Sequence, residues 1–185
     1  MILKDCEELS MIFISGPSTV GKNPLIKAIQ QEYDYDYVVP WTTRNMRKEE
    51  NGIDDYHFVS KDDFKNNIAN DIITEWDYVL ANYYGFSVFD ASSKKVITHG
   101  LSRMTIRIKK RHPNDITTIF LMPKSKEKIF DVLKKIYTGI DLALRLALVE
   151  EEILHSTLFD YIFEVDENSR SLLNNADFLR ILHKN

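Results

Sequence analysis

The fold is decided by residues 11–24, which read Met11-Ile12-Phe13-Ile14-Ser15-Gly16-Pro17-Ser18-Thr19-Val20-Gly21-Lys22-Asn23-Pro24. An apolar run ends at Gly16, four residues follow, and Gly21-Lys22 then precedes a helical pattern that begins at Leu25. In a phosphate-binding loop, a buried strand delivers a glycine turn, amides at a helix N-terminus face the phosphates, and a lysine neutralises their outer oxygens. The order therefore predicts a phosphate loop whose contacts come from Gly16, Ser18, Gly21, Lys22 and Asn23.

The phosphate loop departs from the usual pattern directly after its lysine. A Walker-type loop has Ser or Thr there, whose hydroxyl holds Mg²⁺, and this chain has Asn23. An amide oxygen can ligate a hard cation, so Asn23 is the candidate metal ligand of a weakened site. Pro24 lacks the N–H that would face the α-phosphate and also restricts the residue before it. The alternative is a strand-to-helix turn that binds no ligand.

Composition favours one compact domain in a reducing compartment. The 185 residues are 44% apolar and carry a net charge of -4, which argues against a surface that coats nucleic acid. Cys6 is the single cysteine, so no internal disulfide can form and we expect a cytoplasmic protein. No apolar run approaches the roughly 20 residues that span a bilayer, so no membrane partner is expected.

Strand and helix patterns alternate along the chain, which predicts an α/β fold with a mostly parallel sheet flanked by helices. Strands are expected at 11–15, 35–39, 56–59, 95–98, 116–122 and 161–165, with extended segments at 72–76 and 78–84. Helices are expected at 23–33 and at 171–183. Four more are expected between them: one that begins at Lys61 after a Ser60 cap, one that ends at Arg111, one that begins at Ser125, and one that follows a break at Thr138-Gly139. An Asn51-Gly52 turn is expected between the second and third strands.

Four later segments, read in order, make the chain recognisable. They are Thr42-Thr43-Arg44-Asn45-Met46-Arg47, Asp55-Tyr56-His57-Phe58-Val59-Ser60, Glu75-Trp76 and Asn82-Tyr83-Tyr84-Gly85. Together they resemble the nucleotide-acceptor region of guanylate kinases, and the likeness covers nearly the whole chain. It implies a single domain with a core at 1–39 and 91–185, an inserted monophosphate-binding subdomain at about 40–90, and a shortened lid at about 134–145. It also implies ATP with Mg²⁺ as donor, a GMP-like nucleoside monophosphate as acceptor, and a monomer or homodimer.

The resemblance assigns the acceptor phosphate to four residues, called here the acceptor cluster: Arg44, Arg47, Tyr56 and Tyr84. Two guanidinium groups and two phenol donors suit a dianionic phosphate and can hold it in line for transfer. The alternative is a solvated basic loop next to core tyrosines.

Base recognition is predicted to differ from that of the family. Glu75 matches the acidic residue that reads guanine, although it could instead be an exposed strand residue beside a core aromatic ring. Trp41 and Phe86 replace two small hydroxyl residues that normally help read guanine. Losing both donors should relax discrimination, because unmatched buried polar groups reject a base most strongly. We therefore expect Glu75, Trp41 and Phe86 to form an altered base site.

The donor side of the resemblance is eroded. An Asp-x-Asp of the family is replaced by Thr98-His99-Gly100, and Thr19 stands where a glycine is usual. The lid offers Lys134 and Lys135 but no arginine; these lysines could equally be a solvated helix face. Arg145 matches the arginine that follows the lid, and with Lys22 it is the expected catalytic pair. The alternative places Arg145 in solvent.

Three functions remain open at this stage. The first is a weakened ATP-dependent nucleoside monophosphate kinase with an altered base preference. The second is a catalytically silent guanylate-kinase-like module that binds a phosphate-bearing ligand or partner through the acceptor cluster. The third is a kinase of another phosphorylated small molecule, such as a phosphosugar.

Overall fold

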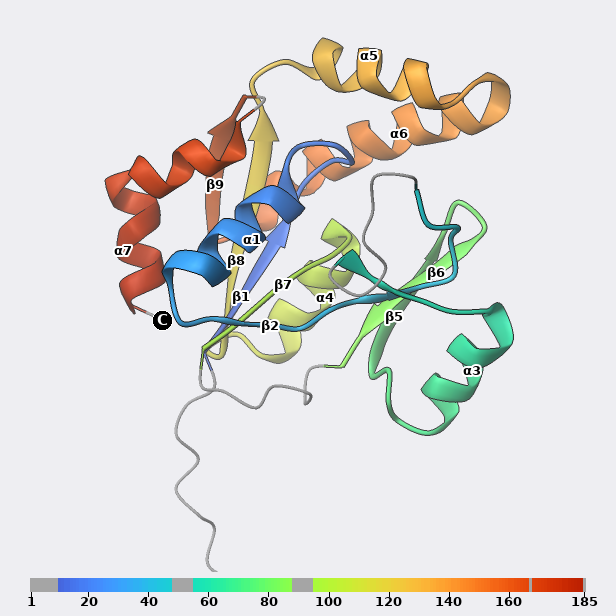
Figure 1. The fold of residues 1–185 in the computed structure, drawn as a ribbon, viewed down its shortest axis with the longest axis horizontal. Helices are drawn as coiled ribbons and strands as arrows, with labels where there is room; N and C mark the ends of the chain where they lie inside the picture. Colours follow the sequence, from blue (N-terminus) through green and yellow to red (C-terminus); the bar gives the residue numbers. More distant parts are fainter. Residues whose placement is uncertain (1–9, 48–54, 88–94, 167, 185) are drawn as a thin grey trace, which may run out of the picture.

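The computed structural model describes residues 10–47, 55–87, 95–166 and 168–184, which form two sheets (Figure 1). The segment with the expected Asn51-Gly52 turn and the N-terminal segment with Cys6 lie outside these ranges. The larger sheet has the order β2-β7-β1-β8-β9, and all of its strand pairs are parallel. Its strands are β1 (Ser10–Ser15), β2 (Asp36–Tyr37), β7 (Lys95–His99), β8 (Ile116–Pro123) and β9 (Tyr161–Val165). The predicted α/β class with a mostly parallel sheet is therefore confirmed.

The central strand β1 divides the core into two layers, because alternate side chains of a strand point to opposite faces. Ile12 and Ile14 pack on one face against α1 and α7, whereas Met11 and Phe13 pack on the other face against α4. The covering helices are α1 (Lys22–Glu32), α4 (Ser102–Arg111), α5 (Lys126–Ile136), α6 (Gly139–His155) and α7 (Ala176–Lys184). None of the helices within the described ranges has the length and hydropathy needed to cross a bilayer.

The C-terminal helix differs from the prediction. The helix expected at 171–183 is a 3-10 helix, Ser169–Asn174, followed by α7. The break falls at Asn175, whose side chain accepts hydrogen bonds from the amides of Asp177 and Phe178 and so caps the second helix. The last strand, expected at 161–165, is confirmed as β9; it lies at the edge of the larger sheet, and Tyr161 and Ile162 are exposed.

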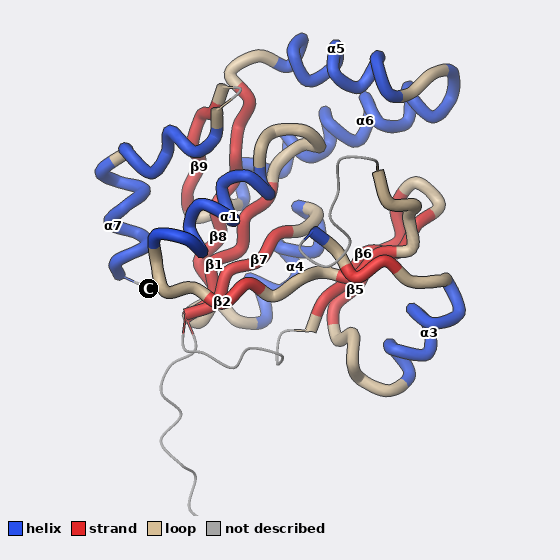
Figure 2. Tube along the Cα trace, viewed as in Figure 1, coloured by secondary structure: helices blue, strands red, loops and turns tan. Residues whose placement is uncertain are grey.

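The second sheet is formed by residues between β2 and β7 and stands beside the larger sheet with helix α3 (Figure 2). Its order is β4-β3-β6-β5, with β3 (Trp41–Thr42), β4 (His57–Phe58), α3 (Lys61–Ala69), β5 (Glu75–Val79) and β6 (Asn82–Phe86). Ser60 caps α3 as predicted, because its hydroxyl accepts the amide of Asp63. The segment expected to be extended over 78–84 instead turns at Leu80-Ala81, where both φ angles are positive, at 50° and 62°.

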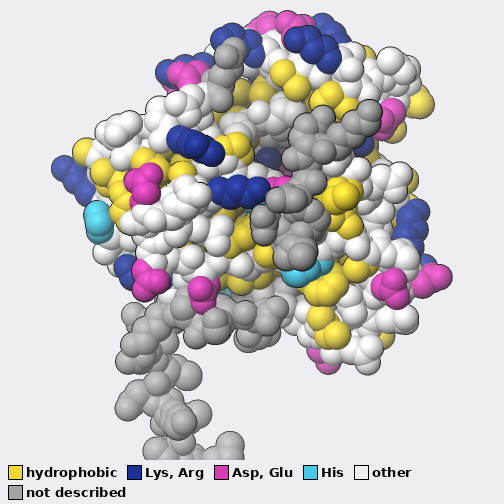
Figure 3. All heavy atoms as spheres, in the orientation of Figure 1, with side chains coloured by type: hydrophobic (Ala, Val, Ile, Leu, Met, Phe, Trp, Pro, Cys, Tyr) yellow, Lys and Arg dark blue, Asp and Glu magenta, His cyan; other side chains and the backbone are white. Residues whose placement is uncertain are grey.

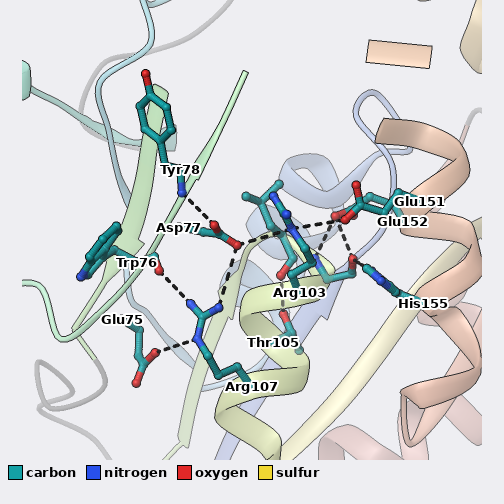
Figure 4. Close-up of polar contacts among 12 residues, drawn as sticks. Glu75, Trp76, Asp77, Tyr78, Arg103, Thr105, Arg107, Glu151, Glu152 and His155 are labelled. Atoms are coloured by element: carbon teal, nitrogen blue, oxygen red, sulfur yellow. Dashed lines mark hydrogen bonds and ion pairs between the residues drawn. The ribbon is translucent and has the colours of Figure 1, made fainter. Parts of the chain in front are cut away.

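Helix α4 fastens the second sheet to the core through a row of arginines (Figure 4). Arg107 donates to the backbone carbonyl of Trp76 at 2.7 Å and lies 3.8 Å from a carboxylate oxygen of Glu75. Arg103 lies between Asp77 of β5 and Glu151 of α6.

On the molecular face drawn in Figure 3, acidic and basic side chains are interspersed and form no large patch of a single charge.

Candidate functional site

A cavity of about 300 Å³ opens between the two sheets at the C-terminal ends of β1 and β7. The phosphate loop lines one side, α6 lines another, and the acceptor cluster faces the loop across the space. In an open parallel sheet this edge is where ligands bind, because loops and helix N-termini converge there. The sequence predicted both the loop and the cluster, and the fold brings them to one cavity.

The phosphate loop has the tight backbone that its glycines allow. Gly21 has φ of 100°, and a Cβ there would approach the hydroxyl of Ser169 to 2.6 Å. The same hydroxyl donates to the carbonyl of Gly21 at 2.8 Å, so the 3-10 helix Ser169–Asn174 anchors the end of the loop. Thr19 has φ of 69°, a left-handed conformation that strains a β-branched residue. Strain of this kind is concentrated at ligand sites, where the surroundings hold it in place.

Lys22 reaches back over the loop that precedes it. Its Nζ donates to the carbonyls of Gly16 at 2.6 Å and Pro17 at 2.9 Å. Burial lowers the pKa of Lys22 to about 8, while the nearby carboxylate of Glu152 opposes that shift and Arg47 adds to it. A phosphate bound in the cavity would therefore favour the charged form of the Lys22 ammonium.

Asn23 is held by a carboxylate from the segment before β4. Its Nδ2 donates to Asp55 at 2.8 Å, and Lys27 lies 3.3 Å from the same oxygen. Among the described residues, no group of three or more His, Cys, Asp or Glu side chains could hold a metal. The amide oxygen of Asn23 and the carboxylate of Asp55 nevertheless suit Mg²⁺, an ion that usually takes its other ligands from phosphate and water.

The acceptor cluster is assembled by contacts among aromatic and guanidinium groups. Arg44 lies over the rings of Tyr56, at 5.1 Å, and Phe58, at 5.2 Å. The rings of Tyr56 and Tyr84 meet edge to face at 6.3 Å. Burial raises the pKa of Tyr84, and the positive charges of Arg44, Arg145 and Arg47 oppose that shift. Both arginines of the cluster therefore act electrostatically on one phenol at the cavity wall.

Arg145 belongs to the same cavity and is not a solvent-facing residue, since only 14% of its side chain is exposed. Its guanidinium lies 3.7 Å above the ring of Tyr137, whose hydroxyl accepts a hydrogen bond from Arg47 at 3.1 Å. Tyr137, which the sequence did not single out, thus connects the acceptor cluster to Arg145. By contrast, Lys134 and Lys135 are exposed, as expected of a solvated helix face.

The three expected base contacts do not line the cavity. Phe86 is fully buried against Phe13, with ring centroids 5.0 Å apart, and Trp41 packs on His57 at 4.4 Å. Glu75 is buried rather than exposed, and its carboxylate is held by Arg111 at 2.5 and 2.6 Å. The cavity is therefore lined without Glu75, Trp41 and Phe86, and their assignment to the base stays a prediction.

Comparison with known proteins gives one consistent family. The family model described as guanylate kinase matches residues 9–180. The chain belongs to the guanylate kinase family. One relative is the guanylate kinase of Aster yellows witches'-broom phytoplasma (strain AYWB), 35% identical over 167 residues, which cover 85% of this chain and 79% of the relative. Another, from Mycoplasma pneumoniae, is 31% identical over 170 residues, 86% of this chain and 70% of the relative.

The guanylate kinase fold is also found by structural comparison. The crystal structure of guanylate kinase from Anaplasma phagocytophilum superposes with a TM-score of 0.64 and 23% identity, covering 95% of this chain and 81% of that one.

Proposed function

We propose that this guanylate kinase family member transfers a phosphoryl group from ATP to a nucleoside monophosphate. Lys22 binds the β- and γ-phosphates, and the acceptor cluster binds the phosphate of the monophosphate. Arg145 lies against Tyr137 near both groups and stabilises the charge of the transferring phosphoryl group. Asn23 and Asp55 supply oxygens for Mg²⁺, which neutralises phosphate charge when it is bound.

The observation that carries this proposal is that the phosphate loop and the acceptor cluster line one cavity. Phosphoryl transfer depends on holding the donor and the acceptor in line, with positive charge around the moving group. Residues 132–141 contain no arginine, and the Asp-x-Asp carboxylates are missing. Both argue for slow transfer, because one transition-state arginine alone is worth about 10³-fold or more.

We further propose that guanine is not read as it is elsewhere in the family. The carboxylate of Glu75 is paired with Arg111 and lies outside the lining of the cavity, which argues against its reading a base bound there. Phe86 occupies the space beside Phe13, where a small hydroxyl residue would leave room. A Cβ at Gly100 would lie 3.0 Å from the terminal methyl group of Met104 and 3.1 Å from the ring of Phe13, so a carboxylate side chain there would require these neighbours to shift.

A coupled ADP-release assay tests the activity. GMP, dGMP, AMP, CMP, UMP, dTMP and ribose 5-phosphate serve as acceptors, with Lys22→Ala as the inactive reference and Lys110→Ala, an exposed change on α4, as the matched control. We expect slow turnover above the Lys22→Ala rate, with no preference of GMP over AMP beyond about tenfold. A strong GMP preference that Glu75→Gln abolishes would contradict the altered base preference. Activity no higher than that of Lys22→Ala with every acceptor would end the kinase proposal.

The second candidate is a silent module that binds a phosphate-bearing ligand. It is favoured by the state of Lys22, whose ammonium is already satisfied by two loop carbonyls. Calorimetry separates the two candidates, because a silent module binds a monophosphate but not ATP with Mg²⁺. Tight binding of ATP that Lys22→Ala abolishes would exclude it.

A further inference from the structure

Residues 98–100, which replace the Asp-x-Asp of the family, differ in whether a polar side chain is present and in what it contacts. The hydroxyl of Thr98 donates to the carbonyl of Val38 at 2.7 Å and is fully buried. Gly100 has no side chain, and a Cβ there would lie only 3.0–3.2 Å from Met104 and Phe13. Of these three residues, only His99, at the end of β7, has a polar side chain that lines the cavity.

The imidazole of His99 is 1% exposed, yet neither ring nitrogen has a hydrogen-bond partner among the residues that the structure describes. Its ring stacks on Tyr37, at 5.9 Å and 25°, and meets the edge of Tyr56, at 5.2 Å and 76°. The aromatic rings fix the orientation of the imidazole but satisfy neither nitrogen. A buried polar group without a partner costs about 1–3 kcal/mol, so such a group at a cavity wall calls for an explanation.

The charges around His99 are those that a phosphate would meet. Lys22 faces it from the phosphate loop, Arg44 from the acceptor cluster, and Asp55 from the segment before β4. Burial, together with Lys22 and Arg44, lowers the pKa of His99 to about 3, and Asp55 opposes the shift only in part. The imidazole is therefore neutral at physiological pH, with one donor and one acceptor nitrogen.

We propose that His99 contacts the bound ligand and donates a hydrogen bond to an oxygen of the acceptor phosphate between Lys22 and Arg44. The inference rests on the proposed function only in requiring that a monophosphate enters this cavity. A neutral donor suits the position, because a carboxylate there would repel the phosphate unless a metal ion lay between them. His99 then acts on ligand affinity from the position between the two acidic residues of the family pattern.

The test compares His99→Phe with His99→Asn. Phenylalanine keeps a ring against Tyr37 and Tyr56 but removes both nitrogens, whereas asparagine restores a donor and an acceptor near the Nδ1 position. Calorimetry with GMP, UMP and ribose 5-phosphate gives the dissociation constants without requiring turnover. Thermal unfolding of the free proteins shows whether a variant is intact, and ring-nitrogen chemical shifts of His99 report direct contact in the wild-type protein.

We expect His99→Phe to weaken binding of the monophosphates by about 10- to 100-fold, because a hydrogen bond to a charged group is lost. Its melting temperature should be equal to or above that of the wild type, since two buried nitrogens without partners are removed. His99→Asn should recover part of the affinity, and the ring-nitrogen shifts should change on binding.

Equal affinity of His99→Phe and wild type, or ring-nitrogen shifts that do not respond to a bound monophosphate, would overturn the proposal and leave His99 as a packing residue. If the wild type binds none of the three probes, the inference fails together with the proposed function. If it binds them through His99 but releases no ADP above the Lys22→Ala rate, only the kinase proposal fails.

Discussion

Arg111 and Glu75 form a two-pronged ion pair between the core and the second sheet, with nitrogen-to-oxygen distances of 2.5 and 2.6 Å. The two residues lie 36 positions apart, on α4 and β5. The side chain of Glu75 is 9% exposed and that of Arg111 is 51% exposed. Because Glu75 is the more deeply buried partner, the ion pair contributes to stability chiefly by giving a buried carboxylate a hydrogen-bonded counter-charge.

The substitution Arg111→Ala should therefore destabilise the protein. Of the basic residues that the structure describes, only Arg107, at 3.8 Å, would then remain beside the carboxylate of Glu75. We expect a loss of about 1–3 kcal/mol, because a buried charged acceptor loses its partner, and a fall in the melting temperature of about 2–4 °C per kcal/mol. Thermal unfolding followed by circular dichroism gives the measurement.

The matched control for Arg111→Ala is Lys110→Ala. Lys110 is the preceding residue on α4, is exposed, and carries the same charge. It should leave the melting temperature within about 1 °C, as surface substitutions usually do. Equal changes in melting temperature for the two variants would mean that Arg111 contributes to stability only through its positive charge on α4 and not through its pairing with Glu75.

Nucleotide binding should weaken in mildly alkaline solution because of Lys22. The pKa of Lys22 is lowered to about 8, so its ammonium loses its proton above that pH in the free protein. Bound phosphate favours the charged form and raises the pKa, so binding takes up a proton there. We expect the affinity for ATP with Mg²⁺ to fall by up to about tenfold per pH unit between pH 8 and 10.

The control for this pH profile is Lys22→Arg, measured by calorimetry over the same range. A guanidinium stays charged throughout, so its affinity should be lower than that of wild type but nearly constant with pH. Parallel declines in both proteins would assign the effect to another group.

Glu152 carries a buried charge whose removal should not harm the fold. Burial raises the pKa of this carboxyl, although Lys22 and hydrogen bonds from Ser102 oppose the shift. An acid whose folded pKa lies above its unfolded value makes the protein less stable as the pH rises through that range. Glu152→Gln keeps an oxygen for Ser102 and removes that cost.

We expect Glu152→Gln to be equal in stability or about 1–2 kcal/mol more stable than wild type at pH 8, with the difference shrinking toward pH 5. Urea unfolding at the two pH values measures it. A variant that is clearly less stable at pH 8 would show that the charged pair with Lys22, not the burial of Glu152, controls the local energetics.

Local patterns in the sequence were sufficient for the strand, glycine turn and helix that begin at residue 11 and for the Ser60 cap, because each depends on residues that are close in the chain. The alternation of strand and helix patterns was sufficient for the parallel core. The turn at Leu80-Ala81 was missed because neither residue is the Gly or Asn that marks most turns with positive φ. The 3-10 break at Asn175 was missed because an apolar helical pattern runs across it.

The surroundings of Glu75, Trp41 and Phe86 could not be predicted for a different reason. Whether Phe86 faces a ligand or the core depends on the space between Phe13 and Met104, which come from β1 and α4. The partner of Glu75 likewise lies on another element. His99 was visible in the sequence as a lone histidine, but only its burial and its unsatisfied nitrogens distinguish it from a packing residue.

Tyr137 provides the sharpest test of how the cavity is held together, because it contacts two arginines, each through a different part of its side chain. Its hydroxyl accepts from Arg47, and its ring lies under Arg145. Tyr137→Phe should keep the ring contact, leave kcat within about threefold, and raise KM for the monophosphate by about 3- to 10-fold as one hydrogen bond to Arg47 is lost. Tyr137→Ala should also release Arg145 and lower kcat by about tenfold, since cation–π contacts contribute about 1–2 kcal/mol when desolvated.

A double-mutant cycle decides whether Tyr137 acts through Arg145. If Tyr137 positions that guanidinium, the loss caused by Tyr137→Ala should largely disappear in an Arg145→Ala background, where kcat is already lower by about 10³-fold or more. Where the protein is too slow for steady-state assays, single-turnover measurements give the same ratios. Additive losses in the cycle would separate the two residues and leave Arg47 as the only group that Tyr137 serves.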